Sequence, residues 1–352
     1  MIGSQTFVVV FALWVGVGVV ALTLVLFAVI VGIRIAQARR RQRSERLARR
    51  WRGLLANAIV QEPTSAPKVS RHDAAEIMSM WGYYHEFLRG DCKANLNRLA
   101  QLAGLDLHAK RGLRSDSVRH RLLSIHVLGN LRDRETRRLL QPISRSTNPY
   151  LSLAAAHALI RISPRESITD LIPMMAARPD WPPARVMAIL QEAGPDVVSE
   201  PLARAAIEAS DAYQPLLLIY LSTGHASAAR RAIKKILMAT SDQQVIITAL
   251  YQLTKMAHPD GLRIARVYLE HPNWLIQLHA VQGIGRMGNE DDVDDLVRML
   301  RHRKYWIRLR AAQALAGLPT MNGQRLAAIR DVQDDRYARD ILQEVIAHKV
   351  AA

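Results

Sequence analysis

The sequence has few of the residues on which several protein classes depend. A single cysteine, Cys92, excludes a disulfide framework and a cysteine-rich zinc module. Aromatic residues make up 5% of the 352 residues and glycines are sparse, which argues against a β-sandwich or a β-barrel. The chain also contains no GxSxG, Walker-type, HExxH or kinase motif. We therefore expect no catalytic residue, no cofactor, no metal site and no small-molecule substrate.

Charged side chains are absent from residues 1–33, and residues 7–33 form one unbroken apolar run. A helix rises about 1.5 Å per residue, so this run is long enough to cross a hydrocarbon core of roughly 30 Å. It is too long for a cleaved signal peptide, and no basic residue precedes it. Residues 1–33 are therefore predicted to contain a transmembrane helix at 7–33.

Residues 34–60 are predicted to form a basic juxtamembrane helix, in which Glu45 is the single acid. Its nine arginines are Arg34, Arg39, Arg40, Arg41, Arg43, Arg46, Arg49, Arg50 and Arg52. Because basic residues are retained on the cytoplasmic side, we expect the N-terminus outside and the rest of the chain in the cytoplasm, attached to the inner membrane. The arginines would contact anionic headgroups.

An apolar stripe on the same helix has two interpretations. Its members recur at helical spacing: Leu47, Trp51, Leu54, Leu55 and Ala58. Such a stripe either lies along the membrane surface or packs on the next domain, and the sequence does not separate the two.

The rest of the chain is predicted to be a repeat array. Residues 61–70 contain two prolines and no periodicity and are predicted to be a linker, and residues 71–115 are predicted to be a helical N-terminal cap. From residue 116 to 352, polar residues at presumed helix starts recur about every 31 positions: Asp116, Asn148, Asp180, Asp211, Asp242, Asn273, Lys304 and Asp335.

Apolar residues repeat with the same period. Ile276, Ala280 and Ile284 recur 31 positions later as Ile307, Ala311 and Leu315. This spacing marks one buried helix face, and a second amphipathic helix follows each stripe. We therefore predict an all-α fold, an α-solenoid of two-helix repeats.

The phrase IRLRAAQALAGL at residues 307–318, supported by LAAAHAL at 153–159, resembles the HEAT-repeat family. It is most similar to the short bacterial repeats that also occur in phycobilisome lyases. The resemblance covers about residues 116–350. It implies a fold and a protein-binding surface rather than a particular activity.

Two other motifs are predicted to be structural. GIGRMG at residues 283–288 matches GxGxxG, but it lies at the end of a helix with no strand before it. Close packing and a helix C-cap explain these glycines better than a dinucleotide site. The acidic stretch 289–295 lacks the EF-hand spacing and is predicted to be a capped helix start.

The candidate partner-binding residues gather at the junction of two repeats. They combine positive charge with two aromatic rings: Arg301, Arg303, Lys304, Tyr305, Trp306, Arg308 and Arg310. An acidic partner, phospholipid headgroups or phosphate would suit this patch. The alternative is a solvated face in which Trp306 packs between repeats. A second cluster, Arg230, Arg231, Lys234 and Lys235, is predicted to be a solvated face.

These patterns predict a single-pass inner-membrane scaffold or adaptor whose solenoid binds another, membrane-associated protein. An accessory subunit of an envelope-polysaccharide or secretion assembly would fit. The alternatives are a phycobilisome-lyase-like protein acting on a protein acceptor and a nucleic-acid-binding HEAT protein. The net charge is +17, of which residues 34–52 supply +8, so the remaining +9 falls short of a dedicated nucleic-acid binder.

Overall fold

The structure is a computed structural model in which every regular element of the described chain is a helix. It describes the backbone of residues 2–351 and their side chains, except those of residues 2–13, 15–23, 25, 28, 36, 40, 41, 350 and 351. The prediction of an all-α fold is confirmed. The described chain divides into two compact units, residues 1–158 and 159–352, and the division falls inside a helix.

The first unit contains one long helix and several short ones. They are α1 (Ile2–Val60), α2 (Ala74–Phe87), α3 (Asp91–Ala103), α4 (Leu105–Gly112), α5 (Val118–Leu131), α6 (Arg137–Ser144) and most of α7 (Pro149–Ile162). Residues 61–70 form no helix. The centre of this unit holds Trp81, which is fully buried and donates its indole N–H to the carbonyl oxygen of Leu96 at 2.9 Å.

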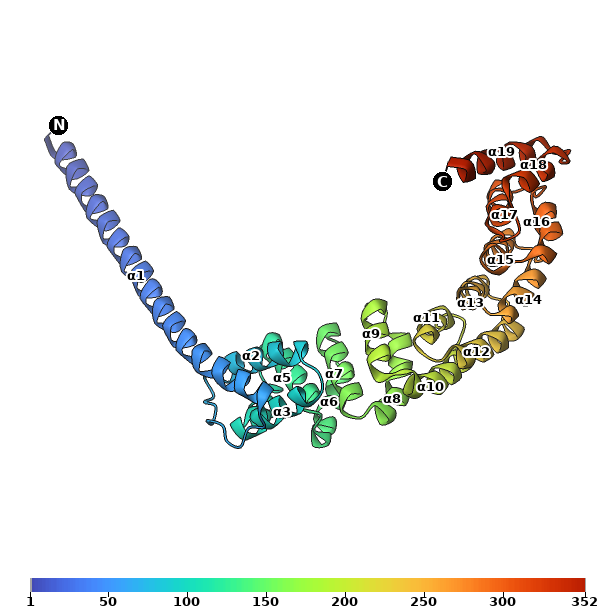
Figure 1. Cartoon of the computed structure of the whole chain (residues 1–352). Coiled ribbons are helices and arrows are strands. Elements are labelled where there is room, and N and C mark those ends of the chain that lie inside the picture. Colours follow the sequence, from blue (N-terminus) through green and yellow to red (C-terminus); the bar gives the residue numbers. More distant parts are fainter. Residues whose placement is uncertain (1, 352) are drawn as a thin grey trace. The chain divides into compact units, whose positions relative to one another are not determined.

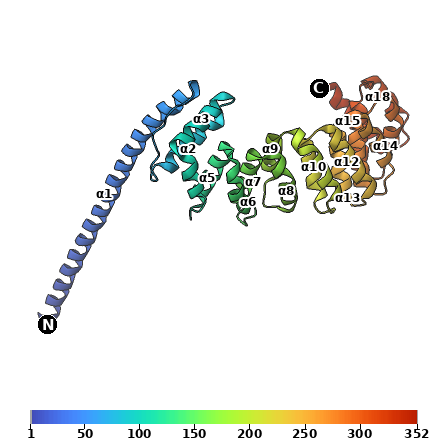
Figure 2. The same ribbon diagram turned by 90° about the horizontal axis from the view of Figure 1, so that it is seen from below.

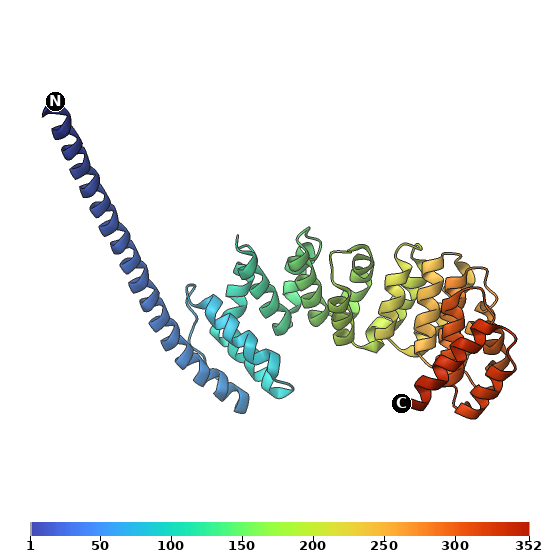
Figure 3. The same ribbon diagram turned by 90° about the horizontal axis from the view of Figure 1, so that it is seen from above.

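The end of α1 packs on the unit that follows it. Trp51, Leu55 and Ala58 are buried, and α1 contacts α2 and α3. Figures 2 and 3 show the last turns of α1 beside these two helices. Of the two interpretations of the apolar stripe, the structure therefore supports packing on the next domain. Burial of these side chains removes apolar surface from water and fixes the helix end in place.

The predicted membrane location is wrong. Among the helices that the structure describes, none has both the length and the apolar character needed to cross a membrane. From residue 29 onward most side chains of α1 are described, and this part of the helix carries the arginines that begin at Arg34. Charged side chains of this kind are unfavourable in the hydrocarbon core of a membrane. Most side chains of the span predicted at 7–33 lie outside the described residues, as do those of Arg40 and Arg41. Within the basic segment, Arg43 forms an ion pair with Asp73 at 2.9 Å.

The second unit is a series of helix pairs. In chain order it contains α8 (Pro164–Ala177), α9 (Pro183–Ala193), α10 (Pro195–Glu208), α11 (Gln214–Tyr220), α12 (Ala226–Ala239), α13 (Gln243–Lys255), α14 (Pro259–Tyr268), α15 (Trp274–Met287), α16 (Val293–Met299), α17 (Tyr305–Gly317), α18 (Gly323–Asp331) and α19 (Arg336–Ala351).

Within this unit the helices form two layers. The first helices of the pairs (α9, α11, α13, α15 and α17) lie on the inner side of the curve in Figure 1, and the second helices (α10, α12, α14, α16 and α18) lie on the outer side. Successive first helices pack directly on one another, α13 on α15, α15 on α17 and α17 on α19. The arrangement is consistent with the predicted α-solenoid.

The predicted stripes form the core between the layers. Ile276, Ala280 and Ile284 on α15 are at most 1% exposed, and Ile307 on α17 is fully buried. Small residues allow close approach of the backbones: a Cβ on Gly285 would lie 2.9 Å from the Cβ of Ala314. The GxGxxG match is thus explained by helix packing, as predicted.

Only half of the predicted helix starts are capped by the periodic polar residue. Asn148, Asp242, Asn273 and Asp335 accept backbone N–H groups of their own helices. The other predicted caps are wrong or absent. Ser117, not Asp116, caps α5. Asp180 instead binds Arg178, and Asp211 accepts from Thr240. Lys304, which keeps the period but lacks the chemistry of a cap, makes no side-chain cap, as expected.

The acidic stretch at 289–295 caps a helix and links neighbouring repeats. Asn289 and Asp292 form a capping box, and Asp292 is fully buried against Arg266, with the guanidinium Nε 2.6 Å from the carboxylate. Glu290 accepts hydrogen bonds from Arg325 and Thr320. Asp292 and Glu290 therefore hold successive helix pairs together.

The interaction of Glu290 with Arg325 makes the free energy of unfolding depend on pH in the acidic range. Arg325, together with Thr320, lowers the pKa of Glu290 to about 2. A carboxyl whose pKa is lowered in the folded state stabilises that state above its unfolded pKa of about 4.3, and this contribution is lost as the pH falls towards 2. We expect the difference in free energy of unfolding between the wild type and Glu290→Gln to be constant near neutral pH and to shrink on acidification, measured by urea unfolding at several pH values.

The exposed neighbour Asp291 supplies the control for this prediction. Asp291 forms no ion pair among the described residues. The variant Asp291→Asn removes a carboxylate that forms no hydrogen bond with a base, so its difference from the wild type in free energy of unfolding should be smaller than that of Glu290→Gln. A pH-independent difference for Glu290→Gln would contradict the prediction.

Candidate interaction surface

The predicted partner-binding residues lie on the turn between α16 and α17 and on the first turns of α17. Tyr305 and Trp306 are the first residues of α17, and their side chains are 46% and 54% exposed. The two rings meet edge to face, with centroids 5.4 Å apart. Trp306 is therefore presented to solvent rather than packed between repeats.

Lys304 and Arg308, which flank Tyr305 and Trp306, contact aromatic rings on the two neighbouring first helices. Lys304 Nζ lies 5.5 Å from the ring centroid of Trp274, the first residue of α15. On the other side, Arg308 Cζ lies 5.2 Å from the ring centroid of Tyr337 on α19. A cation held over an aromatic face is attracted by the ring quadrupole, so these contacts orient both bases. We call Trp274, Lys304, Tyr305, Trp306, Arg308 and Tyr337 the aromatic–basic edge.

The aromatic–basic edge follows the 31-residue period. Trp274 and Tyr305 occupy equivalent positions in successive repeats, and so do Trp306 and Tyr337. Sequence reasoning did not include Trp274 and Tyr337 among the candidate residues. The period itself was the signal that could have found them, because equivalent positions on stacked helices lie side by side.

Hydrogen bonds hold the bases of this region further. Arg308 donates to the carbonyl oxygen of His302 at 2.8 Å, and the backbone N–H of Lys304 donates to His302 Nδ1 at 3.0 Å. Arg301 donates to Gln333 on the α18–α19 turn at 3.3 Å, and Arg310 donates to Gln313 at 2.7 Å. The structure thus keeps four of the five predicted bases in defined positions, while Arg303 is exposed.

None of these five bases forms an ion pair with another described residue. The outer layer of helices differs in this respect. There, Lys234 pairs with Asp260 at 2.7 Å and Arg298 with Asp295 at 2.6 Å, in addition to the buried Arg266–Asp292 pair. Charge is therefore largely neutralised within the outer layer, whereas the turn before α17 and the start of α17 present uncompensated positive charge.

The buried environment also affects histidines near this surface. Burial, aided by the neighbouring charges of Arg308, Lys304 and Arg303, lowers the pKa of His302 below its usual range. On α15, burial and the charge of Arg286 lower the pKa of His279. Since a lowered pKa favours the neutral imidazole at physiological pH, the positive charge of this surface comes from lysine and arginine.

A further cation–π contact lies one repeat earlier. Arg286 of α15 places its Cζ 5.0 Å from the ring centroid of Tyr251 on α13. Tyr251 is 40% exposed. The combination of an aromatic ring with a base from the next first helix therefore recurs on the same layer.

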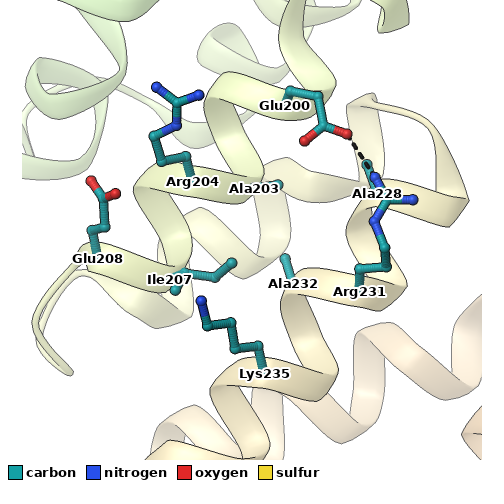
Figure 4. A pocket seen from close by; sticks show the side chains of 9 residues that line it. All are labelled: Glu200, Ala203, Arg204, Ile207, Glu208, Ala228, Arg231, Ala232 and Lys235. Atoms are coloured by element: carbon teal, nitrogen blue, oxygen red, sulfur yellow. Dashed lines mark hydrogen bonds and ion pairs between the residues drawn. The ribbon is translucent and has the colours of Figure 1, made fainter.

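The second predicted cluster is a solvated face. Arg231 pairs with Glu200 at 2.7 Å, and Lys234 pairs with Asp260. Figure 4 shows the shallow pocket between α10 and α12, in which Arg231 pairs with Glu200, while Lys235 extends toward Ile207 and Glu208 lines the other end. This pocket has a volume of about 260 Å³ and a lining of mixed charge. Its three bases and two acids leave an excess of only one positive charge for a charged ligand.

Other hollows of the described residues are open grooves. In the first unit, a groove of about 910 Å³ between α2 and α5 has apolar walls with His120 and His126 among its lining residues. In the second unit, an apolar groove of about 420 Å³ between α12 and α14 exposes Met238 and Val267. No group of three or more His, Cys, Asp or Glu among the described residues is placed to hold a metal ion.

Comparison with known proteins identifies the repeats. Residues 228–316 match the family model described as HEAT repeats, and this match supports the HEAT-repeat family. It supports neither the phycobilisome-lyase branch nor a membrane anchor. No curated protein matches the chain.

Similar solved structures are distant. An engineered protein shares 16% sequence identity over 80% of this chain and 83% of its own, with a TM-score of 0.34. Human deoxyhypusine hydroxylase, solved in complex with glycerol, shares 14% identity over 69% of this chain and 96% of its own, with a TM-score of 0.30. These TM-scores are too low to support an argument about this chain.

Proposed function

We propose, on the premise of the HEAT-repeat match, that this chain is a non-catalytic scaffold that binds a partner protein through the aromatic–basic edge. One observation carries the proposal: half-exposed Tyr305 and Trp306 stand beside bases that have no acidic partner among the described residues. Tryptophan, tyrosine and arginine are the residues that most often dominate the binding energy of protein interfaces.

The regularity of the edge supports a binding role. A single exposed aromatic residue on a surface needs no explanation. Here three successive first helices each contribute exposed or partly exposed rings, and Lys304 and Arg308, at the start of α17, contact the rings of the two neighbouring helices. Stacked repeats provide extended surfaces of this kind without a catalytic cleft. The predicted link to an envelope-polysaccharide or secretion assembly depended on the membrane location and is not part of this proposal.

The variant Trp306→Ala tests the proposal. The full chain is used for affinity capture after cross-linking in its native cells, and the affinity of each captured protein is then measured with purified components. We expect Trp306→Ala to weaken binding of the physiological partner by at least about tenfold, about 1.4 kcal/mol, because it removes a central aromatic contact.

Tyr83 provides the matched control. It is 63% exposed on α2 in the other unit, so Tyr83→Ala removes a similar exposed ring away from the edge. This variant should bind the partner like the wild type. Equal binding by wild type and Trp306→Ala, with every captured protein, would overturn the proposal.

A further inference from the structure

We propose that the partner presents an extended acidic segment to the aromatic–basic edge, with its carboxylates at the centre of the segment, where it meets the start of α17. This inference rests on the proposed function and gives the chemistry of the ligand for the same site. Three observations lead to it: the uncompensated charge, the fixed orientation of the bases and the spacing of the helices.

Charge complementarity sets the sign of the partner. Lys304, Arg308 and Arg310 form no ion pair within the described residues, although acids neutralise the bases of the outer layer. A carboxylate that approaches these three bases would gain charge-assisted hydrogen bonds without displacing an existing pair. An acidic segment is therefore favoured over a neutral or basic one.

The orientation of the bases favours carboxylates. Arg308 is fixed by the ring of Tyr337 and by the carbonyl oxygen of His302, and Lys304 is fixed over Trp274. Side chains that are already ordered lose little conformational freedom on binding. The exposed Arg310 presents a guanidinium whose N–H donors match the two oxygens of a carboxylate, and the fixed ammonium of Lys304 adds a second positive charge.

The spacing of the repeats sets the length of the segment. First helices α15, α17 and α19 pack side by side, and packed helices lie about 8–10 Å apart. An extended chain advances about 3.3 Å per residue. A segment that crosses the edge from α15 to α19 therefore needs about six residues, and its acids belong at its centre, because Lys304, Arg308 and Arg310 all lie at the start of α17.

The same edge is less suited to a nucleic acid. Nucleic-acid surfaces need a continuous track of bases that neutralises successive phosphates. Here the turn that starts α19 carries Asp334 and Asp335, and Asp334 is exposed. These acids interrupt the positive track at its end. A polypeptide can place a neutral residue at that point, whereas a phosphate backbone cannot.

The test uses the full chain and fluorescein-labelled synthetic peptides. The probe peptide carries three glutamates at the centre of a serine–alanine segment, and the comparison peptide has the same composition with the glutamates moved to its ends. Fluorescence anisotropy measures both affinities. We expect the probe peptide to bind at least about threefold more tightly than the comparison peptide, and Lys304→Glu and Arg310→Glu each to weaken its binding about tenfold.

Arg165→Glu is the charge-matched control. Arg165 is exposed in the first turn of α8 and forms no ion pair among the described residues. A glutamate is well tolerated there because the helix dipole favours negative charge. This variant changes the net charge equally and should leave peptide binding unchanged. An equal loss in Arg165→Glu would show only a general charge effect and overturn the inference.

Two further outcomes separate this inference from the proposed function. If the physiological partner depends on Trp306 but the probe peptide does not bind, the acidic segment is wrong and the scaffold proposal stands. If a single-stranded oligonucleotide of equal charge binds more tightly than the peptide, and the same variants abolish that binding, the ligand is a nucleic acid and the inference fails.

Discussion

Replacing Gly285 by valine is expected to lower the free energy of unfolding by about 3 kcal/mol. Gly285 lies where α15 crosses α17, and a Cβ at this position would lie 2.9 Å from the Cβ and 3.1 Å from the Cα of Ala314. Neither atom can rotate away, so the two helices must separate. Valine adds two further methyl groups to this contact.

Alanine at the same position separates two opposing effects. Within a helix, alanine is favoured over glycine by about 1 kcal/mol, and this gain offsets part of the clash. We therefore expect Gly285→Ala to destabilise the solenoid less than Gly285→Val does. Chemical unfolding followed by circular dichroism gives the free energies, and hydrogen exchange shows whether α15 and α17 lose protection first.

Gly323 is the control for both variants. It begins α18, and a Cβ there would meet no atom within 4 Å. Gly323→Ala should leave the free energy of unfolding unchanged or raise it slightly, because it restricts the unfolded chain. If Gly285→Val proves as stable as Gly323→Ala, the close contact of α15 and α17 is wrong.

Replacing Asp292 by asparagine is expected to lower the free energy of unfolding by about 2–3 kcal/mol. Asp292 is fully buried; it accepts from Arg266 at 2.6 Å and from the backbone N–H of Asn289 at 2.8 Å. Asparagine keeps the shape but replaces one acceptor by a donor. Either Arg266 or the backbone N–H of Asn289 then faces another N–H group.

A double-mutant cycle isolates the Arg266–Asp292 pair. Arg266→Gln removes the charge of the other partner. The effect of the double variant on the free energy of unfolding, minus the sum of the two single effects, measures the interaction between Arg266 and Asp292. Asp294→Asn is the control, because Asp294 is exposed on the same helix start. A loss of stability no larger in Asp292→Asn than in Asp294→Asn would contradict the structural role of the buried pair.

The strongly periodic repeats were predictable because burial follows a simple geometric rule. Ile307 and Ala311 recur at helical spacing and face the core, as their pattern indicates. The helix starts near residues 180 and 211 were harder to predict. There Pro183 begins α9 and Pro215 lies in the first turn of α11, so the fixed backbone of proline, rather than an aspartate cap, marks these starts.

The candidate surface was predicted only in part. The basic and aromatic residues of the α16–α17 turn stand together in the sequence, and a local pattern was enough to find them. Trp274 and Tyr337 come from neighbouring repeats, and their contacts with Lys304 and Arg308 depend on how far each side chain reaches between helices. The absence of acidic partners is likewise a property of the fold, because ion pairs such as Lys234–Asp260, which joins α12 to α14, follow from helix packing.

The most direct test of the proposed function is to determine which surface of the chain contacts the partner. A photoreactive phenylalanine analogue is placed at Tyr305 in one full-length variant and at Tyr83 in another, since both rings are exposed and the substitution keeps an aromatic side chain. Each variant is irradiated in its native cells, and cross-linked proteins are identified by mass spectrometry. The account predicts a discrete protein cross-linked from position 305 and not from position 83. The same protein cross-linked from position 83 alone, or no protein cross-linked from position 305, would contradict it.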